Sequence, residues 1–141
     1  LFLTPSLQAY WKVYIMTVRK SGEDYLEAML VLRKKKGYIR SSDIATQLGV
    51  SKPSVSAAIK LLMDGGFVRF DDGKLLDLTE TGEEIAGKIF ERHCVLKQIL
   101  VTAGVDEETA ESEACGIEHE LSDDSFRKLR DFWVQHTQQV K

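Results

Sequence analysis

The chain has 141 residues, of which 43% are apolar and 29% are charged, a composition typical of a globular protein and not of a disordered or fibrous one. Two cysteines, Cys94 and Cys115, are too few for the disulfide framework of a secreted protein, and no run of about 18 apolar residues is available to cross a bilayer. A cytoplasmic protein without a membrane anchor is the expectation.

The net charge of −3 is unevenly distributed along the chain. Residues 17–79 hold 11 Lys and Arg against 8 Asp and Glu, a net charge of +3, whereas residues 80–141 hold 7 against 14, a net charge of −7. Lys12 supplies the remaining positive charge. The first half is therefore suited to approaching phosphates, and the acidic second half to binding cations or to self-association.

The chain begins with Leu1, and its first methionine is Met16. We expect residues 1–20 to be an N-terminal extension, with the natural start at Met16 and with its upstream part adding at most a turn or two of amphipathic helix. The first helix of the body is predicted to start at Ser21, an N-cap with Asp24 three residues on, and to end at residues 34–37.

A second, short helix is predicted from Ser42 or Asp43 onward, and Gly49 is placed to end it in a left-handed conformation. Ser51 then caps a third helix with Pro53 in its first turn, where a missing N–H costs nothing. The inward face of this third helix carries three apolar residues at helical spacing, Val55, Ile59 and Leu62.

Residues 67–70 and 75–79 are predicted to be two short strands on either side of Asp72 and Gly73, a strong hairpin signal. Helices followed by a hairpin in this order predict a winged helix-turn-helix over residues 21–79. The outer face of its third helix is small and polar enough for close approach to a DNA groove; it carries Ser54, Ser56, Ala57 and Lys60. On the hairpin, the expected phosphate contacts are Arg69 and Lys74.

The acidic half predicts three helices. The first is capped at Thr79 or Thr81 and continues to Gly104, the second covers about residues 106–121, and the third begins at Ser122. This last helix carries apolar side chains at helical spacing, Phe126, Leu129, Phe132 and Trp133. The expected fold is therefore mostly α with a small β wing: a winged helix-turn-helix followed, over residues 80–141, by a helical dimerisation and metal-binding domain.

Six residues carry side chains that bind divalent metals: Asp24, Glu27, His93, Cys115, Glu118 and His119. Taken singly, several have a structural explanation, since Asp24 can belong to a helix cap, Glu27 can be a solvated carboxylate and His93 a hydrogen-bonded core histidine. Cys115 and Glu118 are harder to explain in this way. Together with His119 they occupy positions i, i+3 and i+4 on one face of a helix, and the three residues present a thiolate, a carboxylate and an imidazole together.

Four segments of the chain resemble the diphtheria toxin repressor family, the iron- and manganese-dependent repressors: GEDYLEAM at 22–29, the winged helix, ERHCVL at 91–96 and ACGIEHELSD at 114–123. The resemblance extends from Ser21 to the end of the chain. It implies that all six candidates are metal ligands, and that a homodimer binds a palindromic operator in double-stranded DNA and represses metal-uptake genes. It also implies the two-domain form without the SH3-like third domain of the iron branch.

The resemblance places further residues at the start of the DNA-reading helix, where Lys52 and the serines would contact phosphates and Pro53 a thymine methyl. Ser42 would lie on the same surface. The complete set of expected DNA contacts is Ser42, Ser51, Lys52, Pro53, Ser54, Ser56, Ala57, Lys60, Arg69 and Lys74.

The chain also departs from both branches of this family. Its acidic pair on the first helix resembles the manganese branch, whereas Cys115 resembles the iron branch. Lys97 and Glu111 stand where the iron branch has a glutamate and a histidine in an ancillary metal site, so that site is altered here. Because Cys115 softens the ligand set, we expect Fe²⁺ to be slightly favoured over Mn²⁺.

Two other kinds of protein remain possible from the sequence. A winged-helix regulator that responds to a small organic ligand, or to none, would bind DNA equally well with and without a chelator. A metalloenzyme would need a reactive centre, but the sequence has no H-E-x-x-H motif, no nucleophile with an evident base and no glycine-rich phosphate loop. The expectation is that the protein is not an enzyme.

Overall fold

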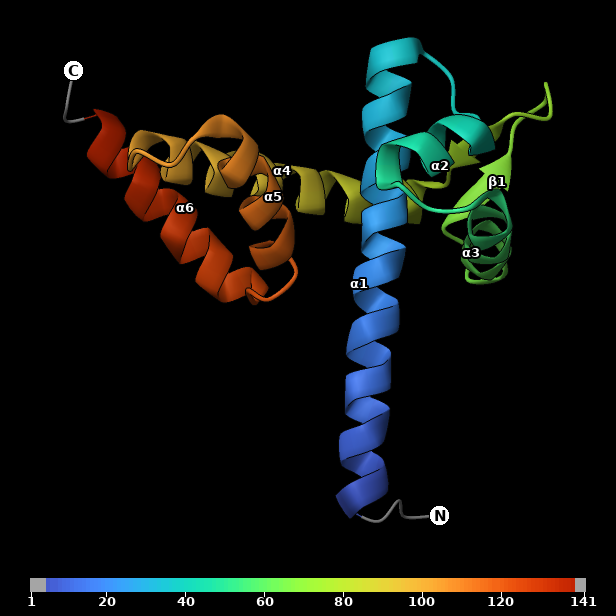
Figure 1. The fold of residues 1–141 in the computed structure, drawn as a ribbon, viewed down its shortest axis with the longest axis horizontal. Helices are drawn as coiled ribbons and strands as arrows, with labels where there is room; N and C mark the ends of the chain where they lie inside the picture. The colour runs from blue at the N-terminus through green and yellow to red at the C-terminus, as the bar shows by residue number, and fades with distance from the viewer. Residues whose placement is uncertain (1–4, 139–141) are drawn as a thin grey trace. The chain divides into compact units, whose positions relative to one another are not determined.

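The computed structural model describes the backbone of residues 5–138 and the side chains of residues 20–137. The chain divides into two compact units, residues 1–87 and 88–141, and the boundary between them falls inside helix α4 (Glu80–Thr102). Six helices and one two-stranded sheet make up the described part, so the prediction of a mostly α protein with a small β wing is confirmed (Figure 1). None of the described helices combines the length and the apolar character needed to cross a membrane.

The first unit begins with α1 (Pro5–Lys36), which is longer than predicted. Ser21 lies inside this helix, so its predicted role as the N-cap is wrong. The helix extends upstream because residues 6–20 contain neither glycine nor proline, and Pro5 suits a first helical turn. At the other end, Gly37 adopts a φ of 81° and donates its N–H to the Arg33 carbonyl at 2.8 Å, which is a left-handed C-terminal cap.

The predicted helix-turn-helix is confirmed by α2 (Ser41–Leu48) and α3 (Lys52–Asp64). Gly49 ends α2 with a φ of 66°, a conformation that few other residues adopt without strain. Ser51 caps α3, since its hydroxyl accepts the N–H of Ser54 at 3.2 Å. The predicted inward stripe of α3 is buried, and it consists of Val55, Ile59 and Leu62.

The wing is a hairpin of two antiparallel strands, β1 (Val68–Phe70) and β2 (Leu76–Leu78). Asp71 closes the turn twice: its N–H donates to the Leu75 carbonyl at 2.8 Å, and its carboxylate accepts the Leu75 N–H at 2.9 Å. Ile39, in the segment after α1, adds one β-bridge to the second strand. The hairpin therefore pairs with the segment after α1 as well as between its own two strands.

The start of α4 is joined closely to the wing. Thr79 caps this helix, because its hydroxyl accepts the Gly82 N–H at 3.1 Å while donating to the Gly66 carbonyl at 2.7 Å. A Cβ atom at Gly82 would lie 2.0 Å from the carbonyl oxygen of Phe67. Only glycine permits this close approach, so Gly82 allows the first turn of α4 to pack against the backbone of Phe67.

In the second unit, α5 (Glu107–Ile117) and α6 (Asp123–Gln138) lie beside the remainder of α4 (Figure 1). The second helix of the acidic half was predicted to continue to Leu121, but α5 ends four residues earlier, at Ile117. Arg92 stabilises the turn that follows α5, since its guanidinium donates to the carbonyl oxygens of Glu118 and Leu121. The apolar core of this unit contains Ile89, Leu96, Ala110, Ala114 and Phe126.

Candidate functional site

His93 is the central polar residue of the second unit. It lies on α4, is only 8% exposed, and has a carboxylate at hydrogen-bonding distance from each ring nitrogen. Its Nδ1 lies 2.8 Å from Oε2 of Glu118, and its Nε2 lies 2.8 Å from Oε1 of Glu111. A buried imidazole between two carboxylates is not an ordinary apolar packing residue, and its two nitrogens have distinct environments.

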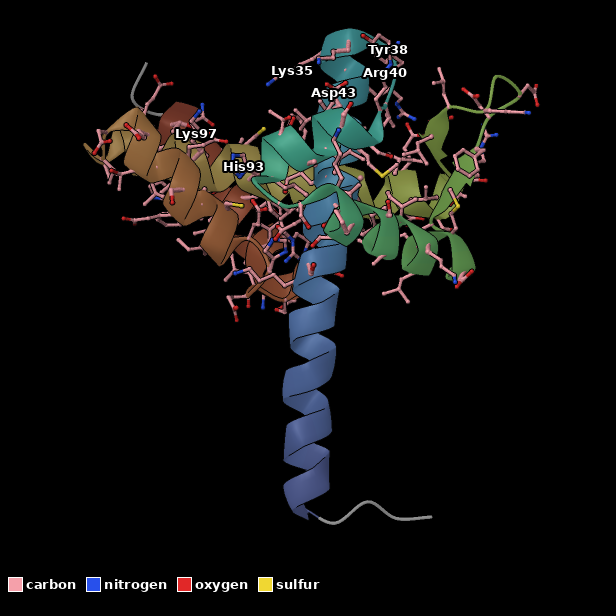
Figure 2. All side chains as sticks on the ribbon, turned by 45° about the vertical axis from the view of Figure 1, so that its right-hand side comes forward. Lys35, Tyr38, Arg40, Asp43, His93 and Lys97 are labelled. Carbon is pink, nitrogen blue, oxygen red and sulfur yellow. The ribbon has the colours of Figure 1, made fainter. Side chains whose placement is uncertain are left out.

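Glu111 has a second partner, Lys97 (Figure 2 labels His93 and Lys97 on α4). The Lys97 ammonium lies 2.8 Å from Oε2 of Glu111, and it holds the pKa of this carboxyl below its ordinary value. The same contact raises the pKa of Lys97. An ammonium group offers no lone pair to a metal, so Lys97 forms an ion pair with Glu111 and is not itself a metal donor.

Glu118 and His119 follow the last residue of α5. Glu118 keeps helical backbone angles, φ −57° and ψ −26°, and its N–H still donates to the Ala114 carbonyl at 3.0 Å. The side chain of Glu118 is completely buried, and its Oε1 lies 3.3 Å from Nε2 of His119. Although the helix is shorter than predicted, the local spacing that places these two side chains together is therefore kept.

Cys115 stands one turn before Glu118 on α5 and is exposed. Its sulfur and a carboxylate oxygen of Glu118 lie within 4.8 Å of each other. A thiolate, a carboxylate and imidazoles are ligands for divalent transition metals, with no sharp preference among Fe²⁺, Mn²⁺ and later metals. The donors of the second unit thus have chemistry that fits such an ion.

Arg92 was not identified from the sequence. It is 7% exposed and donates to the carbonyl oxygens of Glu118 at 3.0 Å and Leu121 at 2.5 Å, and to the Asp123 carboxylate at 2.5 Å. Its guanidinium also lies 5.4 Å from the centre of the Phe126 ring. These contacts fix the turn that carries Glu118, and the only signal in the sequence is an arginine within an otherwise apolar helix face.

The remaining candidate ligands, Asp24 and Glu27, belong to the first unit. They stand three residues apart on α1, so they share a face of the helix, and both are half-buried. The six candidate ligands are therefore divided between the two units, two in the first and four in the second.

The expected DNA contacts lie on exposed parts of the first unit. Along α3 the buried stripe and the candidate contacts occupy different faces, as DNA reading requires. All ten of the candidate positions are exposed: Ser42, Ser51, Lys52, Pro53, Ser54, Ser56, Ala57, Lys60, Arg69 and Lys74. Lys74 has a φ of 61°, so its backbone adopts the left-handed conformation in the wing turn.

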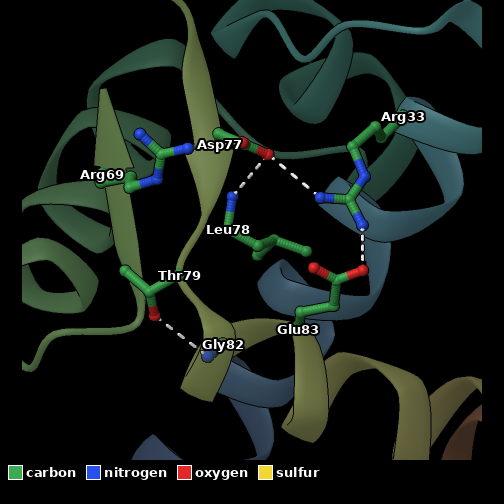
Figure 3. Close-up of polar contacts among 7 residues, drawn as sticks. All are labelled: Arg33, Arg69, Asp77, Leu78, Thr79, Gly82 and Glu83. Atoms are coloured by element: carbon green, nitrogen blue, oxygen red, sulfur yellow. Dashed lines mark hydrogen bonds and ion pairs between the residues drawn. The ribbon is translucent and has the colours of Figure 1, made fainter. Parts of the chain in front are cut away.

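Arg69 takes part in a polar network that the sequence did not reveal (Figure 3). Asp77 on β2 accepts from Arg69 at 3.2 Å and from Arg33 of α1 at 3.1 Å. Arg33 also donates to Glu83 of α4 at 2.6 Å. The wing is thus held to α1 by charge pairs.

A further basic group lies where α1 leads into α2 (Figure 2). The last turn of α1 contains Lys35 and Lys36, and the latter forms an ion pair with Asp43 at 3.0 Å. Arg40 precedes α2 and lies over the ring of Tyr38, 4.7 Å from its centre. Arg40 was not among the expected DNA contacts, and it stands two residues before Ser42.

Two family models match the chain. Residues 16–74 match the N-terminal DNA-binding domain of the iron dependent repressor, and residues 79–138 match its metal-binding and dimerisation domain. The transcriptional regulator MntR of Lysinibacillus sphaericus is 38% identical over 111 residues, which cover 79% of this chain and 80% of that protein. MntR of Escherichia coli O6:H1 is 33% identical over 118 residues, covering 84% of this chain and 76% of the relative.

Solved structures give the same result. The manganese regulator SloR superposes with a TM-score of 0.72 at 27% identity, and IdeR of T. acidophilum with 0.67 at 27%; each match covers 79% of this chain. This chain spans 53% of each of those two chains, about half their length. The matches do not favour a metal-independent regulator, and the named relatives are transcriptional regulators. The winged helix and the ligand motif are thus explained together, because the chain belongs to the iron-dependent repressor family of metal-dependent, DNA-binding transcriptional regulators.

Proposed function

We propose that this protein, as a homodimer, represses metal-uptake genes by binding a palindromic operator when Fe²⁺ or Mn²⁺ is bound. The observation that carries the proposal is the pairing of buried His93 with buried Glu118 at 2.8 Å, with the sulfur of Cys115 within 4.8 Å of Glu118. Burial of a carboxylate is costly unless positive charge compensates it, and a divalent cation supplies that charge.

The proposed ligand set joins donors from both units. His93, Cys115, Glu118 and His119 of the second unit would bind the metal together with the two carboxylates of α1, Asp24 and Glu27. Glu118 would be central to this set, because His93 lies 2.8 Å from its Oε2 and His119 lies 3.3 Å from its Oε1. One or two metals in each subunit are both compatible with this set.

The choice of metal depends on Cys115. A thiolate makes the site softer than one built from carboxylates and imidazoles alone, and we propose on this ground that Fe²⁺ is slightly favoured over Mn²⁺. Among the similar solved structures, SloR is a manganese regulator, and another is a manganese-dependent repressor in complex with manganese at 28% identity. Both ions therefore belong in any test.

Activation would be a shift between two populations. Without metal, the carboxylates of Asp24 and Glu27 repel that of Glu118 and leave the two units loosely coupled. The positive charge of a bound divalent cation would offset this repulsion. The ligand residues of α1 would then hold the DNA-reading unit in one arrangement, which would fix the spacing of two recognition helices in the dimer. A change from 1:99 to 99:1 requires about 5.5 kcal/mol of differential metal affinity between the two arrangements.

On DNA, the N-terminal half of α3 would enter the major groove and Lys60 would contact a phosphate. Lys60 is exposed on α3, so Lys60→Ala should leave the fold intact. We expect this substitution to weaken binding to all sequences alike and to lower the slope of log affinity against log salt by about one. An unchanged slope would remove Lys60 from the interface.

The proposed function is tested by selecting DNA from a pool of random duplexes under anaerobic conditions. Binding is measured with EDTA and then with added Fe²⁺ or Mn²⁺, for the wild type, Glu118→Gln and Glu120→Gln. Glu120 is exposed and lies two residues beyond Glu118, so it provides a control with the same change of charge.

Binding that requires metal, that is lost in Glu118→Gln and that persists in Glu120→Gln would support the repressor and yield its operator. Circular dichroism of the three proteins shows whether each is folded. Equal binding by the folded wild type with EDTA and with metal would refute metal gating.

A further inference from the structure

The two nitrogens of His93 differ in what lies beside them. Nδ1 faces Glu118, a candidate ligand, whereas Nε2 faces Glu111, which was not among the candidate ligands. A neutral imidazole binds a metal through one nitrogen only, and the other nitrogen keeps its proton and donates a hydrogen bond. The group that accepts this second bond decides which nitrogen is left for the metal.

Glu111 is held in place by contacts on both of its oxygens. Oε1 lies 2.8 Å from His93, and Oε2 lies 2.8 Å from the Lys97 ammonium. More than half of the Glu111 side chain is exposed, 55%, so on its own it would sample several rotamers. The contact with Lys97 selects the rotamer in which Glu111 faces the imidazole.

We propose that Glu111, held by Lys97, is a positioning residue that keeps the proton of His93 on Nε2 and so presents Nδ1 to the metal. This inference rests on the proposed metal site. It adds a carboxylate–histidine pair behind the ligand and a lysine behind the carboxylate, a chain that runs from α5 back to α4. Partners of this kind make a ligating imidazole more basic and fix its orientation.

Lys97 also affects which side chains can bind the metal. A carboxylate next to a ligating histidine is itself a potential metal ligand, and it would compete for the ion or recruit another one. Because Lys97 neutralises Glu111 and occupies its second oxygen, this carboxylate remains a hydrogen-bond acceptor. The ion pair thus keeps Glu111 out of the ligand set.

The test measures Mn²⁺ affinity directly, from the electron paramagnetic resonance signal of the free ion, without DNA. Glu111→Ala should weaken Mn²⁺ binding by about tenfold or more, the usual loss when such a partner is removed. Glu107→Ala is the matched control: Glu107 is also on α5, and its carboxylate lies 4.0 Å from the Lys97 ammonium, but no contact joins it to His93. The control should bind within about twofold of the wild type.

A double-mutant cycle separates the role of Lys97. Lys97→Met should change Mn²⁺ affinity while Glu111 is present and change it by less than about twofold in the Glu111→Ala background. Equal effects of Lys97→Met in both backgrounds would overturn the part of the proposal that concerns lysine.

Nitrogen-15 NMR of histidine-labelled, Zn²⁺-loaded protein gives a readout that a purely structural role would not change. In the wild type, His93 should bind Zn²⁺ through Nδ1 and keep its proton on Nε2, and Glu111→Ala should populate both tautomers. Wild-type Mn²⁺ affinity in folded Glu111→Ala, or metal on Nε2 in the wild type, would overturn the inference alone. A wild type that binds neither Mn²⁺ nor Zn²⁺ would overturn the proposed function with it.

Discussion

Cys115 is the residue whose chemistry distinguishes the two candidate metals. Replacing its thiolate with a harder carboxylate in Cys115→Glu should shift the preference from Fe²⁺ toward Mn²⁺ by about tenfold, which corresponds to about 1.4 kcal/mol. The ratio of the two dissociation constants is measured anaerobically. With Co²⁺ as a probe, the thiolate charge-transfer absorption should disappear in Cys115→Glu and persist in Cys94→Ser, since Cys94 is the other exposed cysteine. Persistence of this absorption in Cys115→Glu would show that the thiolate is not a ligand.

Asp106 makes part of the stability depend on pH. Its carboxylate caps α5 by accepting from the Thr109 N–H at 3.0 Å and hydroxyl at 2.9 Å, and these bonds hold the pKa of Asp106 below its ordinary value. Because the folded pKa is the lower one, this contribution is present above the unfolded pKa and is lost as pH falls through the folded pKa. Asp106→Asn keeps a capping oxygen but does not titrate. Its urea midpoint, measured in EDTA from pH 6 to about pH 3, should therefore fall less steeply than that of the wild type, with the difference appearing below about pH 4; parallel curves would contradict this.

The limits of the sequence are clearest at single residues. Ligand candidates such as Glu118 could be predicted because their spacing is local and their chemistry is intrinsic. Arg92 and Glu111 could not be assigned their roles, since their partners are 26 and 18 residues away and depend on how two helices pack. Ser21 was predicted to be an N-cap because its side chain suits that role. The helix starts upstream, at Pro5, because the residues before Ser21 also form a helix.

Helix α1 connects two features of the first unit. It carries the candidate ligands Asp24 and Glu27 and, about two turns later, Arg33, which binds Asp77 of the wing. Arg33→Met should release the wing and weaken operator binding at saturating metal by about fivefold, or about 1 kcal/mol, while metal affinity is unchanged. Lys20→Met removes the same charge from an exposed site on this helix and should have little effect. If metal and operator affinities fall together in Arg33→Met, the arginine acts on the whole unit and not on the wing.

Elements were predicted correctly where their signals are local. The turn at Gly49, the cap at Ser51 and the wing hairpin follow from backbone conformation, capping and strand pairing within a few residues. The errors lie at the start of α1 and at the end of α5. Helix ends are decided by flanking sequence and by tertiary partners, here the contacts of Arg92 with the turn after Ile117.

At the scale of the whole molecule, function depends on assembly. The family model that matches residues 79–138 describes a dimerisation domain, and α6 has apolar side chains that its own chain leaves open. Phe132 is 57% exposed although its ring stacks on His136 at 3.9 Å, and Val134 is 46% exposed. The sequence predicted Phe132 as an apolar position of the helix, but it could not distinguish a residue buried in the core from one that becomes buried only in a dimer interface.

Phe132→Glu tests whether α6 contributes to the dimer. If each Phe132 is buried at the interface, replacing both copies removes roughly 3 kcal/mol or more of apolar burial, and the dimer dissociation constant should rise by more than about 100-fold. Analytical ultracentrifugation measures this, with Gln135→Glu, an exposed position on the same helix, as the control for charge. A monomer offers one recognition helix, so operator binding should fall steeply while Mn²⁺ binding by each subunit persists. A Phe132→Glu protein that remains dimeric would place the interface on another surface.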